Sequence, residues 1–168
     1  MVACSDKTNG SPLPGDPPGE STPRTTRPTS STGSGGSPLA DKEPCSLLTE
    51  SAKTELELSG AGEERKIGSA RTCRWRKRGP SETIIFGVDI WDTAGIDDVP
   101  DDVTINPLPD IGSHKAVQGP AKQGGSCTVF MAVTDSSRVG TTVTAGTDVQ
   151  KGCELALQMA KLVEPKLP

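Results

Sequence analysis

Aromatic and other large apolar side chains are scarce in this chain of 168 residues. Aromatic residues make up 2% of the sequence, tyrosine is absent, and 32% of the residues are hydrophobic. A typical globular domain has about 45–50% when glycine is included. Because apolar burial must offset about 1–2 kcal/mol of backbone entropy per ordered residue, this composition predicts a small core. We therefore expect a mostly disordered chain.

The chain also lacks any apolar run of about 18 residues, the length that a membrane-spanning helix requires. Its first residues, Met1 to Asp6, have neither the basic start nor the apolar stretch of a signal peptide. We therefore expect no membrane association. The expected location is the cytoplasm, the nucleus or both.

Clusters of metal-binding or redox-active residues are missing as well. The five cysteines lie 26 or more residues apart without a CxxC pair, which predicts reduced, unpaired thiols rather than a disulfide framework or a zinc site. Histidine occurs once, as His114, in a glycine- and proline-rich stretch, where we expect it to be solvated. The sequence thus indicates no catalytic residue, no metal and no cofactor, and we predict that the protein is not an enzyme.

Glycine, proline and charged residues are abundant and are arranged in blocks. Glycine occurs 19 times and proline 15 times, and the formal net charge is −4. Residues 1–40 form a Ser/Thr/Pro/Gly-rich tail that we expect to be disordered, and residues 112–126 form a linker. The other blocks are an acidic segment with an amphipathic helix, a basic block, a strand with an acidic motif, and a strand–strand–helix segment, at 41–64, 65–78, 79–111 and 127–168.

Hydrophobic periodicity predicts a few ordered elements within these blocks. Strands are expected near 83–91, 127–134 and 139–145, where apolar and β-branched residues are concentrated. Helices are expected near 44–58 and 152–163, where apolar residues recur at helical spacing. Together these elements would form no more than a small α+β patch.

Two segments are candidate partner-binding motifs. The helix near 44–58 is marginal alone at about fifteen residues, so its leucine stripe needs a surface in this chain or in another protein. The acidic segment after the first strand interleaves carboxylates with Ile and Val, as short docking motifs do, and it lacks the ligand order of a calcium loop. The candidate residues are Leu48, Leu56, Ile96, Asp97, Asp98, Asp101 and Asp102.

Positive charge is concentrated at residues 65–78, which hold seven Lys and Arg and no acidic residue. Closely spaced guanidinium groups neutralise phosphates, and a tryptophan can stack on an unpaired base. The block is therefore a candidate contact for RNA, DNA or a nuclear import receptor, with a solvated basic linker as the simpler interpretation. The candidate residues are Arg71, Arg74, Trp75, Arg76, Lys77 and Arg78.

One short motif resembles parts of two known families. The segment VDIWDTAG at residues 88–95 resembles the WDTAG segment of small GTPases, which implies a Mg²⁺ contact at Asp92 and a γ-phosphate contact at Gly95. No glycine-rich phosphate loop with its lysine occurs in the sequence, so GTP hydrolysis is not expected. The same residues resemble the closing strand of a WD-repeat blade, but no repeat of about 40 residues accompanies it.

The sequence therefore predicts a non-enzymatic, largely disordered regulatory or adaptor protein that binds other proteins through short motifs. Two alternatives remain open. One is a nucleic-acid-binding or nuclear regulatory protein that acts through residues 65–78, and the other is a degenerate small-GTPase-like fragment with WDTAG but no phosphate loop. A reading frame under little selection for folding would also explain the lack of aromatic residues.

Overall fold

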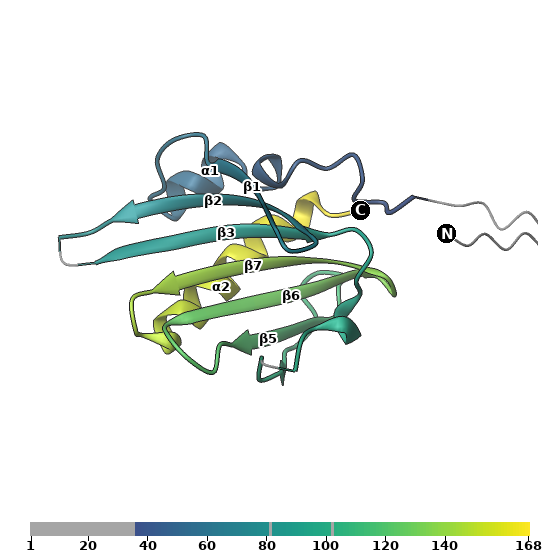
Figure 1. The fold of residues 1–168 in the computed structure, drawn as a ribbon. Helices are drawn as coiled ribbons and strands as arrows, with labels where there is room; N and C mark the ends of the chain where they lie inside the picture. Colours follow the sequence, from purple (N-terminus) through teal and green to yellow (C-terminus); the bar gives the residue numbers. More distant parts are fainter. Residues whose placement is uncertain (1–35, 81, 102) are drawn as a thin grey trace, which may run out of the picture. The chain divides into compact units, whose positions relative to one another are not determined.

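The structure, a computed structural model, describes residues 36–80, 82–101 and 103–168. These residues form a seven-stranded antiparallel sheet with the strand order β1-β2-β3-β7-β6-β5-β4 (Figure 1). The expectation of a mostly disordered chain is therefore wrong. The strands are β1 (Glu63–Ile67), β2 (Ala70–Arg78), β3 (Thr83–Trp91), β4 (Asn106–Pro107), β5 (Ala116–Pro120), β6 (Ser126–Thr134) and β7 (Ser137–Ala145).

Two α-helices cover one face of the sheet. The longer, α2, packs on β6 and β7 (Figure 1), and a hydrogen bond of 3.3 Å from Gln158 to Glu55 joins it to α1. Short 3-10 helices precede α1, follow α2 and lie in the segment after β3. The helical elements are η1 (Pro44–Leu47), α1 (Glu50–Glu55), η2 (Ile96–Asp98), α2 (Val149–Val163) and η3 (Glu164–Lys166).

The alternation of side chains along β3 explains why the two faces of the sheet differ. Every second residue of this strand belongs to the hydrophobic core under the helices and is no more than 7% exposed: Ile84, Phe86, Val88 and Ile90. Side chains of a strand alternate between the two faces. Ile85, Gly87 and Asp89 therefore lie on the face opposite to α1 and α2, which we call the open face.

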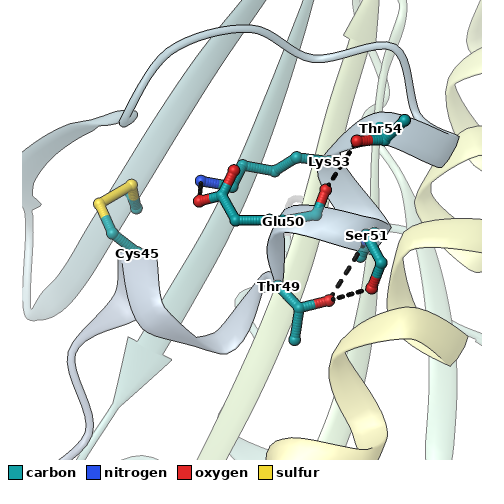
Figure 2. Close-up of polar contacts among 8 residues, drawn as sticks. Cys45, Thr49, Glu50, Ser51, Lys53 and Thr54 are labelled. Atoms are coloured by element: carbon teal, nitrogen blue, oxygen red, sulfur yellow. Dashed lines mark hydrogen bonds and ion pairs between the residues drawn. A yellow bond between two sulfur atoms is a disulfide. The ribbon is translucent and has the colours of Figure 1, made fainter.

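Three strands and one helix lie close to the positions that apolar periodicity predicts, namely β3, β6, β7 and α2. The helix expected at 44–58 is divided, because Leu48 and Thr49 are extended between η1 and α1. Thr49 caps α1 by accepting a hydrogen bond of 3.2 Å from the Ala52 N–H (Figure 2). Leu39, in the tail expected at 1–40, is fully buried, while residues 1–35 lie outside the described part.

The basic block and the expected linker contain strands that composition concealed. Residues 65–78 form most of the β1–β2 hairpin, and β5 lies within 112–126. Cys73 and Trp75 of β2 are buried, whereas Arg76 is exposed. This alternation is a strand pattern. The density of positive charge hid it and favoured the interpretation of residues 65–78 as a solvated linker.

Two disulfides connect the helical layer to the sheet. Cys45 of η1 bonds to Cys73 of β2 (Figure 2), and Cys127 of β6 bonds to Cys153 of α2. The prediction of reduced, unpaired thiols is wrong for these four cysteines. Distant positions in the sequence become neighbours when the two layers pack, and spacing along the chain gives no sign of this. Cys4 lies outside the described residues.

An ion pair holds residues 39–42 against the end of the sheet. Arg71 of β2 donates to both carboxylate oxygens of Asp92, at 2.8 and 2.9 Å, and to the carbonyls of Leu39 and Lys42, at 2.7 and 2.5 Å. The hydrogen bonds from Arg71 lower the pKa of Asp92, and the smaller effect of burial acts in the opposite direction. The pair therefore favours the folded state while Asp92 is ionised.

Removal of a disulfide should destabilise the domain measurably. We expect a Cys45→Ala/Cys73→Ala variant to lose about 3–4 kcal/mol of unfolding free energy, because the bond restricts the unfolded chain. Urea denaturation followed by circular dichroism measures this loss. The matched Cys127→Ala/Cys153→Ala variant, which opens a loop of similar length, should lose a similar amount. An unchanged unfolding midpoint for both variants would contradict the layer-joining role.

The Arg71–Asp92 pair should give a stability difference that depends on pH. The pKa of Asp92 is lower in the folded protein than in the unfolded chain, where it is about 3.9. The stabilisation is therefore present above that value and is lost as the pH falls through the folded pKa. At pH 7 we expect Asp92→Asn to lose about 1–2 kcal/mol relative to the wild type in urea unfolding, and to lose nothing below both pKa values.

The control for this experiment is Asp97→Asn, which changes an exposed carboxylate in the same loop. Its unfolding free energy should stay within about 0.5 kcal/mol of the wild type. A loss in Asp92→Asn that is equal at all pH values would show that the ion pair is not its cause.

Candidate functional site

The open face carries polar and small side chains at the centre of the sheet. Strand register places Arg74, Gly87, Thr142 and Thr128 in one row across β2, β3, β7 and β6. A neighbouring row runs through Arg76, Ile85, Thr144 and Ser126. Two strand pairs that are far apart in the sequence, β2–β3 and β6–β7, thus bring arginine and hydroxyl side chains together.

A buried carboxylate organises these rows. Asp89 of β3 is 3% exposed and accepts hydrogen bonds from the hydroxyls of Thr72 at 2.8 Å and Thr142 at 2.7 Å. It also pairs with Nη2 of Arg74 at 3.0 Å. Desolvation of a carboxylate is costly unless hydrogen bonds and an opposite charge compensate for it. All three partners are present, and Asp89 in turn fixes the position of Arg74.

Gly87 allows Arg74 to lie flat against the sheet. A Cβ atom at Gly87 would be 1.6 Å from Nη1 of Arg74 and 2.5 Å from its Cζ. Any larger residue at position 87 would therefore displace the guanidinium group. The side chain of Arg74 is 19% exposed, so it is held from two sides while part of it reaches solvent.

A cavity of about 290 Å³ lies beside this network on the open face. It is lined by three arginines, three hydroxyl-bearing residues and two isoleucines, and by no carboxylate: Arg65, Arg74, Arg76, Ser126, Thr142, Thr144, Ile67 and Ile85. The hydroxyls of Thr144 and Ser126 are 3.2 Å apart. Guanidinium and hydroxyl groups are donors that suit phosphate or carboxylate oxygens.

Glu63 of β1 partly balances the charge next to this cavity. It pairs with Arg65 at 2.6 Å and with Arg76 at 3.8 Å, and the two arginine side chains remain 43% and 54% exposed. With Glu63 and Asp89 set against Arg65, Arg74 and Arg76, the formal charge of this group is +1.

Strand alternation separates the candidate residues of the basic block. Arg74 and Arg76 lie on the open face, Trp75 is 2% exposed in the core, and Lys77 pairs with Glu57. Arg71 belongs to the ion pair with Asp92, and Arg78 is exposed at the end of β2. The residues of the block therefore lie on both faces of the sheet, and the tryptophan is not available to stack on a base.

The candidate partner-binding residues have two kinds of environment. Leu48 and Leu56 are 2% and 3% exposed and belong to the domain's own core. The acidic residues lie in the segment after β3, where Asp97, Asp98 and Asp101 are exposed and Ile96 is half-buried. Asp98 also accepts a hydrogen bond of 2.7 Å from the Gly95 N–H. Asp102 lies outside the described residues, and a partner for this segment stays a prediction.

The WDTAG residues make contacts within the domain. The carbonyl of Gly95 accepts a hydrogen bond from Arg138, a buried residue whose guanidinium lies 4.5 Å from the Trp91 ring. Burial lowers the pKa of Arg138. With Asp92 bound to Arg71, neither Asp92 nor Gly95 is part of a phosphate site, and the GTPase-like interpretation is wrong.

His114 is not solvated, in contrast to the sequence-based expectation. It is 7% exposed, and its Nδ1 lies 2.8 Å from the carbonyl oxygen of Ala132 on β6. The turn that contains it is pinned by paired backbone hydrogen bonds of 3.0 Å between Ile111 and His114. In the part of the chain that the structure describes, no group of three or more His, Cys, Asp or Glu side chains is placed to hold a metal ion.

Sequence reasoning missed the cavity because its lining comes from separate strands. Thr142 and Thr144 alternate with buried Val143 and Ala145 on β7, and Arg74 and Arg76 alternate with Trp75. Each alternation is visible in the sequence. The pairing of β7 with β3 and β6, which joins them, is not.

Comparison with known proteins shows a family but no individual relative. No curated protein and no solved structure matches the chain. Across the described ranges, no helix has the length and apolarity to cross a membrane. A family described as "Protein of unknown function (DUF3558)" matches residues 1–166. With the folded sheet, this match overturns the prediction of a disordered adaptor and its nucleic-acid-binding alternative, and the chain belongs to the DUF3558 family.

Proposed function

We propose that this protein is a binding domain whose open face holds a small molecule with a phosphate or carboxylate group. One observation carries the proposal: the cavity of about 290 Å³ is lined by three arginines and three hydroxyl-bearing residues without a carboxylate. Arginine binds planar or tetrahedral oxyanions through paired N–H donors. Hydroxyl groups at the opposite wall add donors that can rotate toward the same oxygens.

The anchoring of Arg74 supports binding rather than an incidental hollow. Asp89 and Gly87 hold this side chain in place before any ligand arrives. A donor that is already ordered loses less conformational entropy on binding. The formal charge of +1 around the cavity favours a ligand with one or two negative charges over a long polyanion.

Two isoleucines indicate that the ligand also has an apolar part. Ile67 is 49% exposed, and Ile85 lines the same cavity. Isolated apolar side chains are common on surfaces, but small-molecule sites typically combine apolar walls with a few convergent polar groups. A phosphate or carboxylate joined to a short apolar group fits this lining.

The cavity supports binding without catalysis. Its lining includes no histidine and no cysteine, so it offers no nucleophile with an adjacent general base. The carboxylate of Asp89 accepts from three donors and does not line the cavity. We therefore infer a protein that is not an enzyme.

The two disulfides support a location in an oxidising compartment, since such bonds are rare in the cytosol. This inference differs from the cytoplasmic or nuclear location that the sequence predicts, and that prediction stays untested.

Isothermal titration calorimetry with three matched probes tests the proposed site. Phenyl phosphate and benzoate carry an anionic group on an apolar ring, and benzyl alcohol carries none. We expect one or both anions to bind, with affinity that falls as salt is added, and benzyl alcohol not to bind. Arg76→Gln and Gly87→Ala should each weaken binding about tenfold, the first by removing a charged donor and the second by displacing Arg74.

The control is Lys161→Gln, which removes one positive charge from an exposed position on α2. It should leave the dissociation constant unchanged. If it weakens binding as much as Arg76→Gln, the attraction is general to the protein's surface. If no anion binds at about 10 mM, the proposed function is wrong.

A further inference from the structure

The outer edge of β2 is unpaired over its second half. β1 pairs with Ala70 to Arg74, and its first residue, Glu63, lies opposite Arg74. β2 continues to Arg78, and among the described residues this continuation pairs only with β3. A free strand edge presents backbone N–H and C=O groups that can pair with another chain.

The register shows which backbone groups face outward. The hairpin turns through two residues, so Ile67 and Ala70 form a hydrogen-bonded pair at its end. Because such pairs alternate along antiparallel strands, Thr72 and Arg74 also bond toward β1. The same alternation directs the backbone groups of Arg76 and Arg78 toward the outer edge of β2. β1 does not extend along this part of the edge, so these groups are left unpaired.

A cavity of about 630 Å³ lies along this free edge. One wall is β2 from Arg74 to Arg78, and the other is the segment that leads into β1, through Glu57, Ser59, Gly62 and Glu63. Four cationic side chains and two carboxylates give this lining a formal charge of +2. The edge is therefore bordered by a groove on one side of the sheet rather than by flat solvent.

A buried donor without a partner lies in the wall of this groove. Trp75 is 2% exposed, and its indole Nε1 has no hydrogen-bond partner. Gly62, with a φ of +84°, brings the neighbouring backbone close, since a Cβ there would be 2.7 Å from Nε1. An unsatisfied buried donor is costly, and because Gly62 covers Nε1, the Trp75 ring forms a closed part of the groove wall.

Charge at the edge defines the occupant. Arg76 is 54% exposed and makes only a long pair of 3.8 Å with Glu63. Arg78 is exposed and belongs to none of the ion pairs among the described residues. A second copy that added β2 edge to edge would bring these arginines against their own equivalents, and like charges across a strand pair are destabilising. A segment with carboxylates at alternate positions would instead pair with both arginines.

We propose that Trp75 to Arg78 bind an extended acidic segment of another protein as an added β-strand. Backbone hydrogen bonds to Arg76 and Arg78 would supply affinity, and the two guanidinium groups would select carboxylates at alternate positions. This proposal does not rest on the ligand of the open face. Arg78, which is central to it, does not line the open-face cavity.

Titration of the whole protein with capped peptides of about eight residues tests this proposal. The probe alternates Glu and Val, and its controls are a peptide that alternates Lys and Val and the Glu/Val peptide methylated on the backbone nitrogens of its glutamates. The first control reverses the charge, and the second lacks the N–H groups that would face β2. We expect the Glu/Val peptide to bind and to shift the backbone amide signals of Arg76 and Arg78 in ¹H–¹⁵N spectra. Both controls should bind about tenfold more weakly or not at all.

Matched variants separate the backbone contribution from the charge. Arg76→Ala retains the outward N–H and Arg76→Pro removes it, so the proline variant should bind the Glu/Val peptide about tenfold more weakly than the alanine variant. Arg78→Glu, which keeps the strand intact, should weaken peptide binding about tenfold. It should leave phenyl phosphate binding unchanged within about twofold, which distinguishes the two sites.

Several outcomes would overturn the proposal. Equal binding of the N-methylated Glu/Val peptide, equal affinity of the alanine and proline variants, or unchanged binding in Arg78→Glu would exclude strand addition at this edge. Shifts confined to Thr142 and Thr144 would assign the peptide to the open face instead. A dimer that sedimentation shows to dissociate in Arg76→Pro, which lacks the outward N–H, would identify a second copy as the occupant.

Discussion

Neighbouring residues of a strand point to opposite faces of the sheet, and the α-helices of this domain cover one face only. This constraint assigns Phe86 and Trp75 to the core and places Gly87, Arg74 and Arg76 on the open face. The same alternation buries two charged residues on the open side, Arg138 and Asp89, and Asp89 is the one that pairs with Arg74. Its hydroxyl and guanidinium partners make that burial tolerable, and through them the same constraint builds the proposed site for an anion.

Composition gave a wrong fold class because it averages over unlike parts of the chain. Residues 1–40 contribute almost no large apolar side chain and so lower the mean apolar content of the whole chain. Within the described residues, the apolar residues are concentrated in β2, β3, β6, β7 and the helices. Two disulfides across the layers add stability that a residue count does not include.

The elements that sequence reasoning found are those with one dominant local signal. β3 has strict alternation, and α2 has helical spacing behind Asp148, which caps it with a hydrogen bond of 3.0 Å. The β1–β2 hairpin was missed because its charge suggested a solvated segment. Arginine side chains, however, occupy the polar face of a half-buried strand as readily as a linker.

The candidate site was less predictable than the fold. Arg74 and Arg76 were recognised as functional candidates, but their chemistry depends on Thr142, Thr144 and Ser126, which are contributed by other strands. The disulfides were unpredictable for the same reason, since Cys45 meets Cys73 only when η1 packs on β2. Long-range strand order determines both features, and no local pattern in the sequence encodes that order.

The central claim is that the two faces of one strand have different roles, with the core on one side and ligand binding on the other. Methyl-resolved NMR during titration with phenyl phosphate tests it most directly, because Ile84 and Ile85 are adjacent in β3 but point to opposite faces. We predict that the methyl signals of Ile85 and Ile67 shift with ligand concentration while those of Ile84 and Ile90 do not. Shifts of Ile84 and Ile90 with Ile85 unchanged would contradict this account.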